Sequence, residues 1–238
     1  MNREYQRLLK RYERIFTPQI YRAIKKQVDE YLKQGRVEDI TRDPVIKILE
    51  RLYSEVGGRW AYKTDQQIRR DLKLPKLNFN ERIAGIIRQQ YGPELLNMSD
   101  NITQTTKDHI RTILRGSIER NLTLEQVRAE IQATGVSEAR ARVIARTETV
   151  RAANAGALVN ANEKGYVYQK KWFSVMDNRT RHDHEILDGQ VVDKDQPFKV
   201  RDKDGITQQM MFPGDTSLGA TPEQTINCRC SMQFIAKK

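Results

Sequence analysis

Apolar side chains recur every three or four residues through most of the first 120 positions, the spacing of one face of an α-helix. Pro18 can open a helix at its first turn and Gly35 can close it. Residues 72–80 contain Pro75 and lack a helical period, which predicts a break. The predicted helices cover residues 2–16, 18–34, 43–60, 81–91 and 99–120.

A stronger helix signal begins at Thr123. This residue and Gln126 form the pattern of a capping box, in which each side chain bonds to the backbone N–H of the other residue. The pattern predicts a short helix that ends near Gly135. Ser137 can then cap a long helix through about residue 164, rich in small residues that allow close packing against a neighbour.

After residue 165 the pattern changes to partial alternation of apolar and polar side chains, which is typical of strands. Strands are expected at 166–175, 190–192 and 230–235. The predicted fold class is α+β: a basic helical region over residues 1–120, followed over residues 121–238 by a small α+β domain with a long helix and short antiparallel strands.

Composition narrows the class of protein. Hydrophobic residues make up 38% and charged residues 31% of the chain, so it is polar without having the composition of a disordered chain. No stretch approaches the roughly 20 apolar residues that span a bilayer, and the charged N-terminus does not resemble a signal peptide. We therefore expect a protein that acts in a cytoplasm and without a membrane partner.

The net charge of +11 is concentrated in the first half, where residues 1–120 hold 25 Lys and Arg against 16 Asp and Glu. Basic proteins meet polyanions, so nucleic acid or an acidic protein surface is one interpretation. The other is a solvated helical surface in which Arg and Lys serve as good helix formers, because no long basic run stands out.

Four short motifs occur in order in the second half. They are Ala145-Arg146-Thr147-Glu148 with Asn154-Ala155-Gly156; Trp172 with Asp177-Asn178-Arg179-Thr180, His184 and Leu187-Asp188-Gly189; Pro197-Phe198; and Phe212-Pro213-Gly214-Asp215 with Asn227-Cys228-Arg229-Cys230. Each is weak alone, but the ordered set resembles the phage Mu F-like head-morphogenesis family over about residues 121–236.

The resemblance implies a virion or minor capsid protein that acts in procapsid assembly and is carried by a phage or prophage. It implies binding at the portal protein or the inner capsid, with capsid or scaffold proteins as further partners. Its location would be inside the head, after assembly in the host cytoplasm. We expect any contact with packaged DNA to be electrostatic and independent of base sequence.

The motif residues also have a structural interpretation. Arg146 and Glu148 lie two apart on a helix, so they should pair with groups elsewhere in the domain, Arg146 with an aspartate of the later turns. Asp177 and Thr180 can bond backbone N–H groups of a tight turn, and Gly189 suits a positive φ. Trp172, His184, Cys228 and Cys230 complete this structural set.

The same residues contain a candidate zinc site. His182, His184, Cys228 and Cys230 together offer the two nitrogen and two sulfur donors of a tetrahedral site. Some relatives in the family carry a C-x-x-C pair where this chain has Arg181 and His184, so in that register only His184 keeps a ligand position. A disulfide between Cys228 and Cys230 would be strained, which leaves packed thiols or metal ligands as the two interpretations.

Catalysis is the remaining alternative. His184 beside Asp177 or Asp188 would suit a metal-dependent nuclease, and Cys228 beside His184 would suit a thiolate nucleophile. Against this, the sequence contains no nucleophile elbow, P-loop, HExxH or dinucleotide-binding fingerprint. We therefore predict that the protein is not an enzyme and needs no cofactor, with zinc as the open exception.

Overall fold

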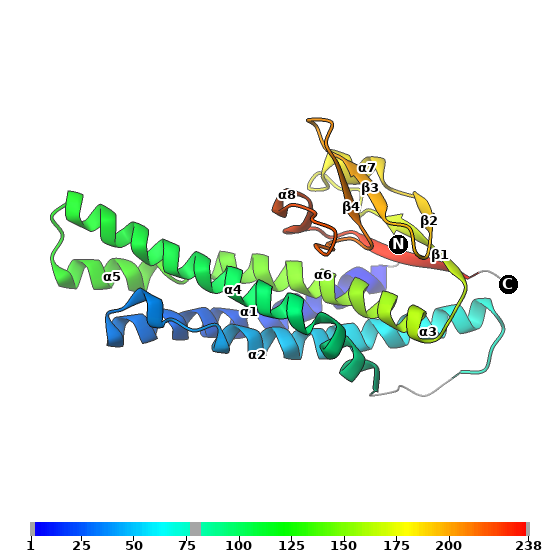
Figure 1. Cartoon of the computed structure of the whole chain (residues 1–238), viewed down its shortest axis with the longest axis horizontal. Helices are drawn as coiled ribbons and strands as arrows, with labels where there is room; N and C mark the ends of the chain where they lie inside the picture. The colour runs from blue at the N-terminus through cyan, green and yellow to red at the C-terminus, as the bar shows by residue number, and fades with distance from the viewer. Residues whose placement is uncertain (1–2, 77–81, 237–238) are drawn as a thin grey trace. The chain divides into compact units, whose positions relative to one another are not determined.

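The computed structural model describes residues 3–76 and 82–236 and confirms the α+β class. The chain forms two compact units built from interleaved segments (Figure 1). The first unit comprises residues 1–12, 52–90 and 146–238, and the second comprises residues 13–51 and 91–145. The sequence boundary near residue 120 marks where the family resemblance begins and stays a prediction.

Three long helices contribute residues to both units. These are α1 (Arg3–Gln34), α4 (Arg82–Glu119) and α6 (Glu138–Glu163). The other helical elements are η1 (Val37–Asp39), α2 (Asp43–Leu52), the π-helical turn η2 (Tyr53–Gly57), α3 (Gly58–Asp71), α5 (Leu124–Thr134), α7 (His182–Ile186) and α8 (Pro222–Thr225).

The second unit is entirely helical among its described residues. Its buried apolar side chains include Phe16, Ile20, Ile24, Leu49, Ile110 and Ile131. Gln27 is a buried polar exception, and its Nε2 donates to Thr41 O at 2.7 Å and to Thr103 Oγ1 at 2.8 Å. These bonds satisfy the donor of the buried amide, whereas its Oε1 is buried without a hydrogen-bond partner in the described part of the chain.

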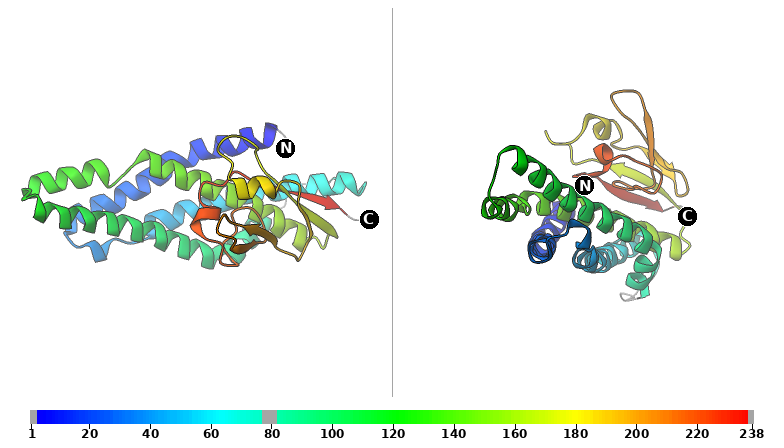
Figure 2. Two further views of the ribbon diagram at one scale, coloured as in Figure 1. Left: turned by 90° about the horizontal axis from the view of Figure 1, so that it is seen from above. Right: turned by 60° about the vertical axis from the view of Figure 1, so that its left-hand side comes forward.

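The first unit combines helices with all five described strands. Strands β1 (Tyr168–Phe173), β2 (Val191–Asp193) and β5 (Ser231–Ala236) form an antiparallel sheet in the order β2-β1-β5, with β1 and β5 side by side (Figure 2). In this pair Trp172 lies opposite Met232. Strands β3 (Phe198–Arg201) and β4 (Thr207–Met210) form a separate hairpin.

Helix α6 is buried on nearly all sides over residues 147–161 within this unit. Its small residues explain this burial, because they let backbones approach closely. A Cβ on Gly156 would lie 2.2 Å from the carbonyl oxygen of Gly57, and Gly57 is the last residue of the π-helical turn. The close approach of these two helical backbones therefore requires glycine at position 156.

Several predicted boundaries were right and two were wrong. The Thr123 capping box is present with both of its hydrogen bonds, and α6 lies within one residue of its predicted limits at both ends. The helices predicted to separate at Pro18 and at Gly92-Pro93 are instead continuous in α1 and α4. A proline removes one hydrogen bond from a helix, but a continuous buried face can hold the helix together across it. Part of the predicted break at 72–80 lies outside the described residues.

Among the helices of the described residues, none combines the length and apolar character needed to cross a lipid bilayer.

Candidate metal centre

Three potential metal ligands that are far apart in sequence meet in the first unit. His184 comes from the short helix α7, and Cys228 and Cys230 come from the segment that leads into β5. Their donor atoms lie within 4.8 Å of one another, and all three residues are buried. Within the described residues this is the one group of three or more His, Cys, Asp or Glu side chains that could hold a metal ion.

The distances in this His184–Cys228–Cys230 cluster converge on one imidazole nitrogen. His184 Nδ1 lies 3.5 Å from Cys230 Sγ and 3.7 Å from Cys228 Sγ. The Cys230 N–H also lies 3.4 Å from Cys228 Sγ, an orientation that favours a thiolate at Cys228. Both cysteines are free thiols.

Hydrogen bonds orient the His184 ring. Gln224 on α8 donates from Nε2 to Asp183 Oδ2 at 2.8 Å, which leaves its Oε1 as an acceptor at 2.9 Å from His184 Nε2. In the neutral ring the proton is therefore assigned to Nε2, and the lone pair of Nδ1 faces the two thiols. The indole of Trp172 packs edge-on against the ring at a centroid distance of 5.3 Å.

His182 lies outside the cluster. Its side chain is 83% exposed, and its Nδ1 is 3.7 Å from Glu185 Oε2. The two histidines are two residues apart on one helix, so they project to different sides. The predicted four-residue set is therefore reduced to three protein donors.

The two thiols have different acidities. A hydrogen bond from the Cys230 thiol lowers the pKa of Cys228, and the charges of Arg181 and Arg229 act in the same direction. The same hydrogen bond, together with burial, raises the pKa of Cys230. The pair therefore favours one thiolate at Cys228 while Cys230 keeps its proton.

The Asp177 turn is held to the cysteine segment by an ion pair. Both oxygens of Asp177 accept hydrogen bonds from the guanidinium of Arg229, at 2.6 and 2.5 Å, and this pairing lowers the pKa of Asp177 below its usual range. Asp177 Oδ1 also accepts from the Arg179 N–H, and Thr180 Oγ1 accepts from the Asp177 N–H. Gly189 has a φ of +82°, the left-handed conformation expected of it.

Glu148 belongs to a buried network that the sequence did not reveal. It accepts hydrogen bonds from Tyr53 Oη at 3.0 Å and from Arg151 Nη1 at 3.1 Å, and Arg151 Nε donates to Gly214 O at 2.7 Å. Burial is the largest single effect and lowers the pKa of Arg151, but attraction to Glu148 and the interactions with Tyr53 and Asp215 together outweigh it, so the net pKa is raised. The spacing of three residues on one helix was the available signal for this pair.

Other side chains of α6 hold the last motif in place. Arg146 Nη1 donates to Asn227 Oδ1 at 2.8 Å, so Arg146 contacts an amide of that motif. Thr147 Oγ1 accepts from the Asn227 N–H. Asn154 donates to Pro213 O and Cys230 O and accepts from the Met232 N–H. Helix α6, which carries the first motif, is thus bonded to the fourth motif and to the start of β5.

The predicted catalytic pairs are only partly formed. Asp177 is bound by Arg229, and Asp188 Oδ1 accepts from the Ser174 N–H, while the two ring nitrogens of His184 face Gln224 and the thiols. A histidine–aspartate base pair for a nuclease is therefore not assembled at His184. The Cys228–His184 contact exists, but it is buried.

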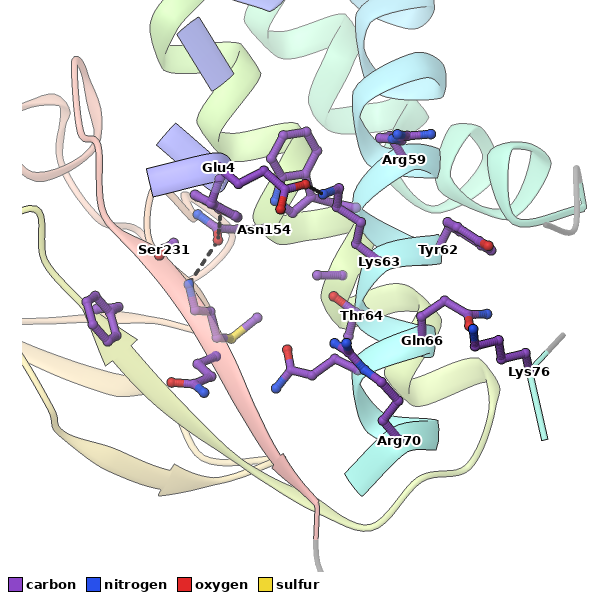
Figure 3. A pocket seen from close by; sticks show the side chains of 17 residues that line it. Glu4, Arg59, Tyr62, Lys63, Thr64, Gln66, Arg70, Lys76, Asn154 and Ser231 are labelled. Atoms are coloured by element: carbon purple, nitrogen blue, oxygen red, sulfur yellow. Dashed lines mark hydrogen bonds and ion pairs between the residues drawn. The ribbon is translucent and has the colours of Figure 1, made fainter. Parts of the chain in front are cut away.

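A separate pocket of about 820 Å³ lies in the same unit, between the start of α1, α3, α6 and β5 (Figure 3). Aromatic and apolar side chains, among them Trp60, line part of it. Its charged lining consists of one acid and four basic residues: Glu4, Arg59, Lys63, Arg70 and Lys76. Glu4 pairs with Lys63 at 2.6 Å, so the remaining lining charges are positive.

Comparison with known proteins agrees with the motif pattern. The profile of a family described as Phage Mu protein F like protein matches residues 108–233, which is more than half of the chain. Over 102 residues, 42% of this chain and 31% of the relative, the chain is 33% identical to minor head protein GP7 of Bacillus phage SPP1.

Two further relatives match more of the chain. NAD(+)--arginine ADP-ribosyltransferase EFV of Enterococcus faecalis is 29% identical over 181 residues, 73% of this chain and 35% of that protein. The uncharacterized protein YqbB of Bacillus subtilis is 26% identical over 133 residues, 55% of this chain and 42% of that protein. The chain thus spans between about a third and two fifths of these relatives, and no solved structure matches it.

Proposed function

Because the chain belongs to the family of Phage Mu protein F like proteins, we propose that it is a minor head protein that acts in phage head morphogenesis. In this proposal it joins the head during procapsid assembly in the host cytoplasm and binds the portal protein or the inner capsid, with capsid or scaffold proteins as further contacts. It then stays inside the virion.

The observation that carries the proposal is that the separate motifs contact one another. Asp177 of the second motif pairs with Arg229 of the fourth, and Trp172 packs on Phe198 of the third. Arg146, Thr147 and Asn154 of α6 contact the Asn227–Cys230 motif, and Arg151 and Asn154 contact the loop before it. The residues that carry the family resemblance are thus one connected structure. The similarity to a minor head protein supports the same interpretation.

The test is genetic and biochemical. In a phage or prophage that carries this gene, deletion should lower the yield of infectious particles, and a tagged full-length chain should restore it. The tagged chain should co-purify with the portal protein of the same phage and be found by mass spectrometry in washed, nuclease-treated heads. If the deletion leaves infectivity and the other head proteins unchanged, the proposal is refuted.

Contact with packaged DNA is a finer part of the proposal, supported by the cationic lining of the pocket. Arg59, Arg70 and Lys76 are exposed there, and DNA phosphates bind such side chains without reading base sequence. Binding should therefore weaken steeply as salt concentration rises.

Substituting these three residues together by alanine should lower the slope of log affinity against log salt by up to about three, roughly one per lost phosphate contact. The matched control replaces Lys26, Lys33 and Arg142, three exposed basic residues of the second unit. An equal loss in both triple variants would indicate general attraction to a basic protein, and binding that ignores salt would refute an electrostatic contact.

The proposal includes no enzymatic activity. The segment that resembles the ADP-ribosyltransferase also resembles a minor head protein in part, so it is not specific to transfer chemistry. We therefore assign no transferase activity to this chain. Transfer of labelled ADP-ribose from NAD(+) to arginine by this chain, or plasmid cleavage that His184→Ala abolishes, would overturn this assignment.

A further inference from the structure

We propose that the His184–Cys228–Cys230 cluster binds one Zn²⁺ ion, with the fourth coordination position taken by water. The proposal is independent of the role in head assembly. It depends on the distances, the hydrogen-bond directions and the charge of the cluster.

The distances match those of a tetrahedral site. Bonds of about 2.3 Å from zinc to sulfur and about 2.0–2.1 Å from zinc to nitrogen place a sulfur about 3.5–3.6 Å from a nitrogen. The two sulfur atoms lie 3.5 and 3.7 Å from His184 Nδ1. Both sulfur–nitrogen distances are therefore at the spacing that zinc requires, and the three donors, which come from two separate chain segments, all lie within 4.8 Å of one another.

The hydrogen bonds around the cluster leave both sulfurs facing one lone pair. Gln224 directs the proton of His184 to Nε2, so Nδ1 offers a single in-plane lone pair. The lone pair of Nδ1 and both sulfur atoms therefore converge on one point. A metal ion placed there would be bound by all three atoms.

The surroundings supply the outer hydrogen bonds that zinc ligands usually have. The carboxamide of Gln224 fixes the imidazole, and the Cys230 N–H points to Cys228 Sγ. Ser174 Oγ lies 3.6 Å from Cys230 Sγ, but it already donates to His184 O and accepts from Trp172 Nε1, so it supports the site from outside. Water is therefore assigned to the fourth position.

The charge of the complex suits a buried position. Two thiolates and a neutral imidazole cancel the two positive charges of zinc, so the filled site is neutral. Burial of a neutral cluster avoids the large cost of an isolated buried charge. The soft sulfur donors also favour zinc over magnesium or calcium, which prefer oxygen ligands.

The first measurement is the zinc content of the purified full chain, by elemental analysis after gel filtration. We expect one zinc per chain in the wild type, and in His182→Gln, which alters an exposed histidine on the same helix. Cys230→Ser and His184→Gln should lose it. Zinc in the wild type no higher than in Cys230→Ser, even after incubation with zinc under reducing conditions, would overturn the proposal.

If the ligand variants fail to fold, cobalt spectroscopy of the wild type tests the metal site. Cobalt added to the folded, metal-stripped wild type should produce the strong visible bands of tetrahedral cobalt and a near-ultraviolet sulfur-to-cobalt band. Folded protein that lacks both bands would exclude the site.

Gln224→Leu tests the orientation of the ring. Loss of an outer-shell partner typically weakens metal affinity 10–100-fold. We expect a loss of that size in competition with a chromophoric chelator, with the zinc stoichiometry retained. Unchanged affinity would show that Gln224 does not position His184 for a metal.

Discussion

Substitution of Gly156 by alanine tests the close approach of the two helical segments in the first unit. A Cβ at this position would lie 2.2 Å from Gly57 O and 2.5 Å from Gly57 C and Cα. Carbon atoms in favourable contact are about 3.5–4.0 Å apart, so the helical backbones would have to separate by about 1 Å or more. Backbone cannot move aside as the end of a flexible side chain can.

The expected magnitude is the difference of two terms. Overpacking of a tight contact costs about 1–3 kcal/mol and sometimes more, and a backbone clash belongs at the upper end. Alanine recovers about 1 kcal/mol of intrinsic helix stability relative to glycine. We therefore expect Gly156→Ala to lower the free energy of unfolding by about 2 kcal/mol or more, equivalent to a Tm lower by about 4–8 °C.

The assay follows tryptophan fluorescence during urea unfolding. The chain has two tryptophans, Trp60 and Trp172, and both belong to the first unit, so the signal reports that unit. The matched control is Gly85→Ala, on α4 in the same unit, where a Cβ meets nothing within 4 Å. This control should raise the free energy of unfolding by about 0.5–1 kcal/mol. If Gly156→Ala proved as stable as Gly85→Ala, the reasoning from backbone contact would be wrong.

Three further predictions concern stability. Arg151→Met should lower the free energy of unfolding in urea by about 3–5 kcal/mol, because it leaves the buried carboxylate of Glu148 without a charged partner, and a loss below about 1 kcal/mol would show that water reaches this site. Thr123→Ala removes the capping box and should lower the free energy of unfolding by about 1 kcal/mol, seen as a lower Tm. Thr123→Asn should leave it nearly unchanged. Burial lowers the pKa of Lys170 from 10.5 to about 8, so between these pH values the unfolded chain binds more protons. The wild type should therefore gain up to about 3 kcal/mol relative to Lys170→Met as pH rises from 8 to 10.5, and a constant difference would contradict the low pKa.

The local sequence pattern predicted most helices of this protein but not all of their boundaries. The Thr123 cap and the extent of α6 were predictable because capping and periodicity act over a few residues. The continuity of α1 through Pro18 was not, because a proline disfavours a helix locally and only burial of the flanking turns against other elements compensates. The π-helical turn that ends at Gly57 had no sequence signal.

The candidate site shows the same division. The sequence by itself identified His184, Cys228 and Cys230 by their chemistry and placed them in a family by motif order. It left His182 as a possible fourth ligand, and the tertiary structure excluded it, because the α7 helix turns His184 inward and leaves His182 in solvent. The sequence did not reveal that Gln224 contacts His184. The two residues are 40 positions apart, and only folding brings them together. Residue types thus determined which chemistry was available, and long-range packing decided which atoms meet.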